Sequence, residues 1–267
     1  MNQRQALSAL AVKSAWTAAA VRRPEAKVRL YCLPFLGGSA DFYLPLARQL
    51  PPWVETVPVE LPGYGRRNEG PSPRSLPALA HSLLEMLTKD AMGKPSAVFG
   101  HCGGGLVAYE MTRQLQTQAV EQPVLLGVSS TPPPHQWQQL LTRMKHKPLT
   151  HLMPLTREVA RDPVYRQAGF RGLFSGEAAV YRTYRPEGLL PLECPVSVFG
   201  GREDPVIWPE ALSAWSELSN AEVRKRIYPG EHFYLTTHWP QVARSLALDL
   251  DAALHSPPSA RPSEGSP

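Results

Sequence analysis

The sequence predicts an α/β protein with a mainly parallel central sheet, helices on both faces of that sheet and a helical insertion between two strands. Short apolar runs alternate with segments whose apolar residues recur at helical spacing, a pattern typical of parallel sheets. A glycine-rich turn at residues 100–104 joins one such run to the next helical pattern. In sheets of this kind, functional side chains gather at the carboxyl ends of the strands.

The spacing of apolar residues places each element along the chain. Short continuous apolar runs favour strands, and apolar residues every three to four positions favour helices. We expect strands at residues 28–33, 54–61, 96–99, 124–128, 195–199 and 224–228. We expect helices at residues 44–50, 76–87, 106–115 and 241–254.

We expect one large domain at residues 27–254, since 267 residues suffice for a single α/β core. The alternation of strands and helices is interrupted at about residues 134–190, a stretch with helical pieces and no clear strand. We interpret this insertion as an active-site lid; the alternative is an extra structural helix pair. Residues 1–26 are expected to form an N-terminal arm rather than a signal peptide, and residues 255–267 a disordered tail.

Composition limits the classes of function. The net charge of +5 is mild, and no basic stripe with interleaved aromatic residues predicts a nucleic-acid partner. No apolar run reaches membrane-spanning length, and no pattern of metal-ligand spacing is present. The three cysteines are far apart and odd in number, which favours a reducing, cytoplasmic location. Of these, Cys32 and Cys194 lie in apolar runs and are expected to be buried and unreactive.

Cys102 is the candidate nucleophile. It stands at the centre of a G-x-C-x-G sequence between a strand pattern and a helix pattern. In the related G-x-S-x-G motif, a sharp strand-to-helix turn exposes the central side chain, and small neighbours avoid clashes. Gly100 and Gly104, and also Gly103, are expected to serve that purpose. The alternative for Cys102 is a buried cysteine beside a tight helix start.

Acidic and basic partners for this thiol follow the last two predicted strands. Asp204 comes after residues 195–199, and His232 comes after residues 224–228. The order nucleophile, acid, base is that of a triad in which the base activates the nucleophile and the acid orients the base. Glu203 competes with Asp204 for the acid position. Taken singly, Asp204 could be a turn or cap residue, and His232 an ordinary loop histidine.

Backbone N–H groups complete the predicted site. An acyl group attacked by a thiolate develops negative charge on its carbonyl oxygen, and backbone donors stabilise that charge. The N–H of Gly103, directly after the nucleophile, is one candidate donor. The second candidate is the N–H of Leu36, in the turn that follows the first strand.

The chain resembles the type II (editing) thioesterases of nonribosomal peptide and polyketide synthesis. The resemblance rests on LPFLGGSADFYLPLARQLP, VELPGYGRR, FGHCGGGLVAYEM, GGREDPV and PGEHFYL, and it covers nearly all of residues 27–254. It implies an α/β-hydrolase fold with a helical lid. It also implies a catalytic triad of Cys102, Asp204 and His232, with Leu36 and Gly103 as oxyanion donors.

The resemblance implies substrates carried on the phosphopantetheine arm of acyl or aminoacyl carrier proteins, and no cofactor bound by this chain. The family usually has serine where this chain has Cys102. An acyl-cysteine is a thioester, so passing its acyl group to a second carrier thiol is nearly balanced in free energy. Cys102 therefore favours an acyl or aminoacyl transferase, as in similar cysteine-dependent aminoacyltransferases of the superfamily. The alternatives are an editing thioesterase, an engineered serine replacement and an inactive carrier-binding module.

Carrier proteins of such systems are commonly acidic, so basic residues are candidates for the docking surface. They occur at residues 66–67, in the expected lid at residues 143–147 and in the last strand at residues 224–226. An ordinary solvated surface is the alternative.

Overall fold

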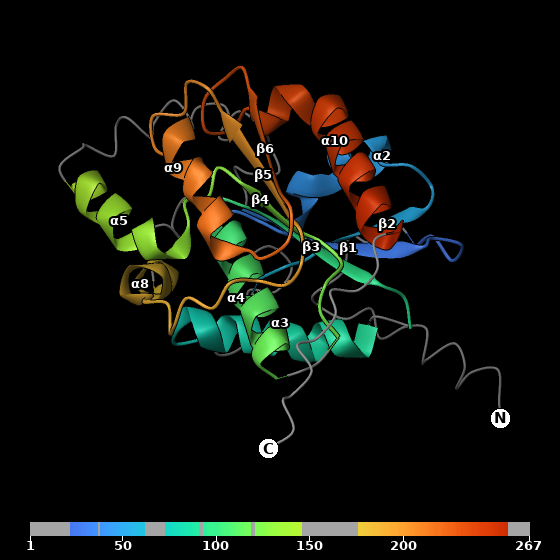
Figure 1. Ribbon diagram of the computed structural model, residues 1–267, viewed down its shortest axis with the longest axis horizontal. Helices are drawn as coiled ribbons and strands as arrows, with labels where there is room; N and C mark the ends of the chain where they lie inside the picture. Colours follow the sequence, from blue (N-terminus) through green and yellow to red (C-terminus); the bar gives the residue numbers. More distant parts are fainter. Residues whose placement is uncertain are drawn as a thin grey trace.

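The computed structural model describes residues 22–36, 38–61, 73–90, 93–118, 121–145 and 176–255. In these segments six strands form one sheet in the order β2-β1-β3-β4-β5-β6, and every neighbouring pair is parallel (Figure 1). The predicted parallel sheet is confirmed. The strands are β1 (Val28–Leu33), β2 (Val54–Pro58), β3 (Ser96–His101), β4 (Leu126–Ser129), β5 (Val196–Gly201) and β6 (Val223–Tyr228).

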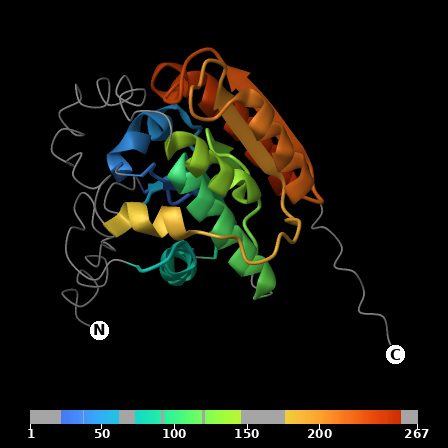
Figure 2. The same ribbon diagram turned by 90° about the vertical axis from the view of Figure 1, so that its left-hand side faces the viewer.

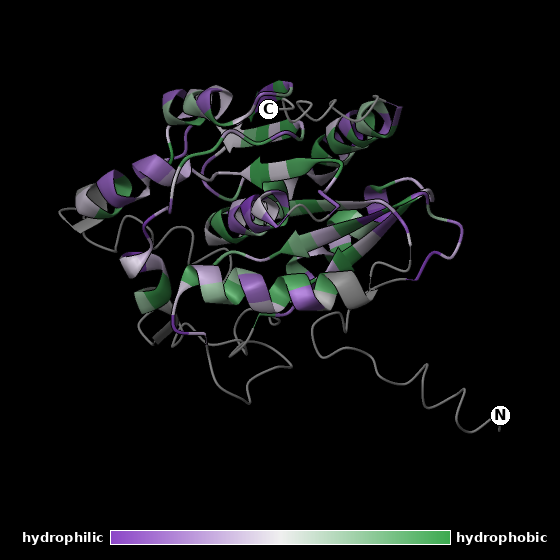
Figure 3. Cartoon of the chain, turned by 60° about the horizontal axis from the view of Figure 1, so that its bottom comes forward, coloured by the Kyte–Doolittle hydropathy of each residue, from purple (hydrophilic) through white to green (hydrophobic). Residues whose placement is uncertain are grey.

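Helices cover both faces of the sheet, and each face has its own apolar cluster. Along β1, Tyr31 and Leu33 belong to one cluster, whereas Leu30 and Cys32 belong to the other. This alternation is expected of a strand buried on both faces, and Figure 3 shows the strands largely in the hydrophobic colour. One face carries α2 (Leu44–Gln49), preceded by the 3-10 helix η1 (Ala40–Tyr43), and α10 (Leu235–His255). The other carries α3 (Leu76–Asp90), α4 (Gly103–Thr117), α9 (Pro209–Ser213) and the 3-10 helix η5 (Ala214–Leu218).

Two helices begin earlier than the apolar pattern indicates. Helix α4 starts at Gly103 rather than at residue 106, because its first turn is built from glycines that carry no hydrophobic signal. Helix α10 starts at Leu235 rather than at residue 241, and it bends at His238, just before Pro240. The short helix α9 and the 3-10 helix η5 were not predicted, because one or two helical turns contain too few residues for a regular spacing of apolar side chains to be recognised.

Two helices of the expected lid region are described. A 3-10 turn η2 (Pro134–Gln136) leads into α5 (Trp137–Lys145), and α8 (Gly176–Thr183) precedes β5. The indole Nε1–H of Trp137 donates to the carbonyl of Tyr181 at 2.7 Å, so α5 and α8 lie together (Figures 1 and 2). Residues 146–175 of the insertion lie outside the described part of the chain. So do residues 1–21 of the expected arm and residues 256–267 of the expected tail.

The turn between β3 and α4 needs glycine at two positions. A Cβ atom at Gly100 would collide with the backbone of Gly104. A Cβ atom at Gly104 would collide with the carbonyl groups of Leu33 and Pro34, at the end of β1. Backbone atoms in a packed sheet cannot move aside cheaply. The two glycines therefore let α4 start directly against the end of β1.

Replacing Gly104 with alanine is expected to lower the free energy of unfolding by about 1–3 kcal/mol, because the new methyl group overpacks fixed backbone. Urea denaturation of Gly104→Ala would measure this. Leu248→Ala, at a side chain that is 64% exposed on α10, is the control and should change stability by less than about 0.5 kcal/mol. Equal stability of Gly104→Ala and the unchanged protein would contradict the steric argument.

Candidate active site

The three predicted triad residues come together at the carboxyl ends of neighbouring strands. Cys102 directly follows β3, Asp204 lies in the turn after β5, and His232 lies in the turn after β6. In the order of the sheet, β4 separates β3 from β5, and β6 is next to β5. The parallel topology thus gathers residues that are far apart in the sequence at one edge of the sheet.

Cys102 occupies a strained backbone conformation. Its φ of 53° and ψ of −120° lie outside the regions that side-chain-bearing residues favour. Its N–H donates to the carbonyl of Ser129 at 2.8 Å, and its own carbonyl accepts from the hydroxyl of Thr131 at 2.9 Å. Residues held in such conformations by surrounding contacts cluster at functional sites. Cys102 is partly exposed, whereas Cys32 and Cys194 are buried as expected.

Asp204 and His232 form a buried hydrogen-bonded pair. His232 Nδ1 lies 2.8 Å from Asp204 Oδ2. The other carboxylate oxygen, Oδ1, accepts the N–H groups of Val206 at 2.8 Å and Ile207 at 2.9 Å. Three donors therefore fix the orientation of the carboxylate, and the carboxylate in turn fixes the orientation of the imidazole ring. The Nδ1 atom of His232 is thereby engaged, which leaves Nε2 for the thiol.

Charge on its neighbours makes His232 a base of unusual strength. Burial by itself would lower the pKa of His232. The charges of Asp204 and of the Cys102 thiolate, together with hydrogen bonds from both side chains, outweigh burial and raise this pKa to about 10. Burial likewise opposes ionisation of Asp204, but the His232 charge and the hydrogen bonds lower the Asp204 pKa overall. Both directions favour a charged triad with imidazolium at its centre.

Glu203, the competing acid, points elsewhere. Its side chain is exposed, and its Oε2 accepts the N–H of Gly230. Because Glu203 is bound to Gly230, only Asp204 of this pair contacts the imidazole.

The two predicted oxyanion donors also lie side by side. A Cβ atom built at Gly103 would lie 3.5 Å from the Cβ of Leu36, although 67 positions separate the residues. Gly103 is the first residue of α4, where N–H groups have no acceptor within the helix. Among the described residues, no hydrogen bond is assigned to the N–H of Leu36 or of Gly103. Both donors are available near Cys102.

A second histidine beside the triad is held neutral. The rings of His101 and His232 lie 5.1 Å apart between centroids. Complete burial, and then the charge on His232, lower the pKa of His101 well below its usual value. Its Nδ1 lies 3.0 Å from the hydroxyl of Ser129, which in turn lies 2.7 Å from the hydroxyl of Tyr234. Of the two neighbouring imidazoles, only His232 carries a positive charge.

Sequence reasoning missed the contribution of the β4 end. Ser129 joins His101 to Tyr234, and Ser130 donates to the carbonyl of His232 at 3.3 Å. Ser130 has a φ of 44°, and with Cys102 it is one of two non-glycine residues of positive φ in the described chain. The signal was present, since the Ser-Ser-Thr run directly follows an expected strand, as Cys102 does.

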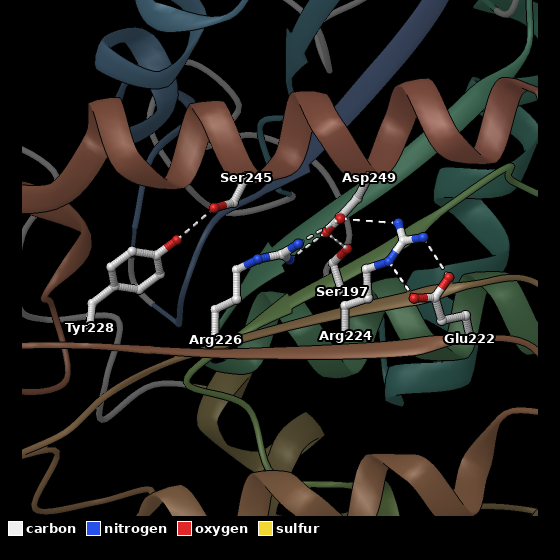
Figure 4. Close-up of polar contacts among 7 residues, drawn as sticks. All are labelled: Ser197, Glu222, Arg224, Arg226, Tyr228, Ser245 and Asp249. Atoms are coloured by element: carbon white, nitrogen blue, oxygen red, sulfur yellow. Dashed lines mark hydrogen bonds and ion pairs between the residues drawn. The ribbon is translucent and has the colours of Figure 1, made fainter.

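An ion-pair cluster around the buried carboxylate of Asp249 holds β6 and α10, the two elements that flank the His232 turn (Figure 4). Asp249 of α10 accepts from Arg224 at 3.1 Å and from Arg226 at 2.5 and 2.7 Å, both on β6. It also accepts from the hydroxyl of Ser197 on β5 at 2.5 Å. Nearer the turn, the hydroxyls of Tyr228 and Ser245 lie 3.0 Å apart. These contacts fix the distance between β6 and α10, and the turn that carries His232 connects these two elements.

The same cluster includes two basic residues of β6. The charges of Arg224 and Arg226 are compensated by Asp249, and that of Arg224 also by Glu222. The basic residues at 66–67 and 146–147 lie outside the described segments. Nothing is described of the side chains at 143–145.

Comparison with known proteins identifies the family. The family model of the thioesterase domain matches residues 28–249, which is most of the chain. The chain belongs to the thioesterase family. Its fold is the α/β-hydrolase fold, here with six described parallel strands flanked by helices, and it is an enzyme of that superfamily.

Among curated relatives, this thioesterase is 26% identical to the gramicidin S biosynthesis protein GrsT of Aneurinibacillus migulanus. That match covers 79% of this chain and 84% of GrsT. It is 28% identical to the thioesterase PikA5 of Streptomyces venezuelae, over 88% of each. Among solved structures, it is similar to the type II thioesterase BorB from the borrelidin biosynthetic cluster. That match has 27% identity, a TM-score of 0.71, and covers 90% of this chain and 97% of BorB.

Two further properties bear on the classes of function. Within the described segments, no group of three or more His, Cys, Asp or Glu side chains is arranged to hold a metal ion. In the same segments, no helix has both the length and the apolar character that crossing a bilayer requires.

Iodoacetamide at neutral pH is expected to label Cys102 alone. Burial raises the pKa of Cys32 well above its usual value and that of Cys194 to about 12, and alkylation requires thiolate. An unpaired thiol is only a few per cent thiolate at pH 7, so His232→Gln should slow labelling about tenfold or more. Peptide mass mapping gives the site, and the time course gives the rate. Unchanged labelling of His232→Gln would show that the imidazole does not activate the sulfur.

The His232 ring is expected to titrate near pH 10, followed by NMR of ¹³Cε1-labelled histidine. Asp204→Asn and Cys102→Ala each remove a negative neighbour and should lower this midpoint. The folded pKa lies above that of about 6.5 in an unfolded chain. The associated stabilisation is therefore complete below about pH 6.5 and is lost as pH rises through about 10. A midpoint near 6.5 in the unchanged protein would contradict the charged triad.

Proposed function

We propose that this thioesterase releases acyl groups from carrier proteins of nonribosomal peptide or polyketide synthesis, with Cys102 as nucleophile. The observation that carries the proposal is the alignment of Cys102, His232 and Asp204 at the carboxyl ends of β3, β6 and β5. The names of GrsT and BorB support a role in such pathways. PikA5 and BorB are named as thioesterases, which supports hydrolysis better than transfer.

The reaction begins at the charged pair. The Cys102 thiolate attacks the carbonyl carbon of the carrier-bound thioester, and the N–H groups of Gly103 and Leu36 receive the negative charge on the carbonyl oxygen. As that intermediate collapses, the bond to the phosphopantetheine sulfur breaks, and the departing thiolate takes the proton of His232. The acyl group then resides on Cys102. Asp204 keeps the imidazole oriented throughout.

Deacylation requires His232 as general base. Its Nε2, now unprotonated, takes a proton from water, and the hydroxide attacks the acyl-cysteine. Collapse releases the free acid and restores the thiolate–imidazolium pair. No bound cofactor takes part in this sequence; the phosphopantetheine belongs to the partner carrier protein.

Transfer to a second carrier is the other candidate, and the sulfur of Cys102 is the observation that favours it. If a phosphopantetheine thiol replaces water in the second half, one thioester is exchanged for another at nearly equal free energy. An acyl-serine ester would make that step uphill. The two candidates share every residue named above and differ only in the final acceptor.

The experiment supplies a carrier protein loaded with an acyl group and a second carrier with a free phosphopantetheine thiol. Intact-mass analysis follows the donor, the enzyme and the acceptor. We expect an acyl adduct on Cys102 and free acid, both absent in Cys102→Ala. Removing one oxyanion donor typically costs about 10²–10³ in rate, so the full site should exceed buffer hydrolysis by a wide margin.

Acylation of the second carrier protein distinguishes transfer from hydrolysis. Acyl label on the second carrier identifies transfer, and label only in free acid identifies hydrolysis. Cys102→Ser is the matched variant, because its ester intermediate should retain hydrolysis and lose transfer. Absence of both a Cys102 adduct and enzyme-dependent release, with every carrier tested, would overturn the proposal.

A further inference from the structure

The ring of Tyr181, on helix α8, lies against Gly103, the residue that follows Cys102. A Cβ atom at Gly103 would lie 2.8 Å from Cε1 and 3.2 Å from Cζ of this ring. The same hypothetical atom would lie 3.5 Å from the Cβ of Leu36. Tyr181 is only 1% exposed. A side chain from the insertion therefore packs against Gly103, one of the two residues whose N–H groups we assign to the oxyanion, and Leu36 is a further neighbour of the same glycine.

Contacts to α5 hold the Tyr181 backbone in place. Its carbonyl accepts the indole N–H of Trp137 at 2.7 Å, and the two rings lie 6.4 Å apart between centroids. The side-chain amide of Gln138 donates to the carbonyls of Arg182 at 3.2 Å and Tyr184 at 2.6 Å. Three hydrogen bonds from α5 thus hold the C-terminal end of α8.

Contacts to α4 hold α8 from the other side. The hydroxyl of Tyr184 donates to Glu110 Oε2 at 3.1 Å, and Glu110 is fully buried. Arg113 compensates the charge of Glu110, with its NH2 atom 2.6 Å from Oε1. Breaking a buried, charge-assisted contact of this kind leaves an unsatisfied group and is costly. The ring of Tyr181 is therefore a fixed wall of the site.

The chemistry places the acyl group against this wall. In the attacked thioester, the carbonyl oxygen lies about 3 Å from the donors at Gly103 and Leu36. The first carbon of the acyl chain is bonded to the same carbonyl carbon, so it lies next to those two residues as well. The Tyr181 side chain, which packs against Gly103, limits the volume open to that carbon and to those that follow.

We propose that Tyr181 determines specificity by restricting the enzyme to short acyl or aminoacyl groups. This inference rests on the proposed function, since it assumes that Cys102 becomes acylated. It adds the size class of the acyl group and the residue that sets it. The phenol ring excludes longer chains by occupying the space into which they would extend.

The test compares acyl thioesters of N-acetylcysteamine with acetyl, butyryl, hexanoyl and octanoyl groups. The ratio of kcat/KM for octanoyl to that for acetyl is measured for the unchanged enzyme and for Tyr181→Ala. We expect the unchanged enzyme to prefer acetyl, and the ratio to rise about tenfold or more in Tyr181→Ala, since each methylene that gains a pocket contributes about 1 kcal/mol or more. Tyr181→Phe is the control and should keep the ratio, because it retains the ring.

A ratio is used because a general loss of folded enzyme lowers every rate equally and leaves the ratio unchanged. The Trp137 contact is made by the backbone carbonyl, so it survives truncation of the side chain. If Tyr181→Ala does not fold, Tyr181→Leu, which keeps apolar packing, is measured against the same criterion. A preference for octanoyl in the unchanged enzyme, or an unaltered ratio in the truncated variant, would overturn the inference. Failure of every thioester to acylate Cys102 would instead refute the proposed function.

Discussion

The left-handed backbone of Cys102 is the constraint on which the rest of the site depends. That conformation turns the chain from β3, which ends at His101, into α4, which begins at Gly103, within one residue. It persists because backbone contacts from β4 and the close approach of α4 to β1 leave no room to relax. Strain of this kind is stable only when the surrounding packing overdetermines it.

Near that turn, the pKa values of two histidine rings are shifted in opposite directions because their surroundings differ. His232 faces the Asp204 carboxylate and the Cys102 side chain, and these two raise its pKa to about 10 despite burial. His101 lies beside a serine hydroxyl and the His232 ring, and burial together with the charge on His232 lowers its pKa well below the usual value. The same side chain at a similar depth thus has opposite pKa shifts in the two places.

The sequence was informative where function imposes residue types at strand ends. The six strands and the meeting of Cys102, Asp204 and His232 could be predicted, because apolar runs and short polar turns mark those ends directly. The family resemblance selected Asp204, whereas the residues alone left Glu203 as a competitor, since the choice depends on which carboxylate the turn points inward. Tyr181 also escaped prediction, because its role arises from the packing of an insertion that has no regular spacing relative to the elbow.

The cluster centred on Asp249 has a consequence for how the enzyme tolerates change. Asp249 lies on α10, after the turn that carries His232, and its partners Arg224 and Arg226 lie on β6, before that turn. Substitution of this one buried carboxylate would remove the common acceptor of two half-buried guanidinium groups and loosen the turn that carries His232, so turnover would fall while the reactive atoms stayed chemically intact. A position on the far side of α10 from the chemistry thus contributes to placing the imidazole.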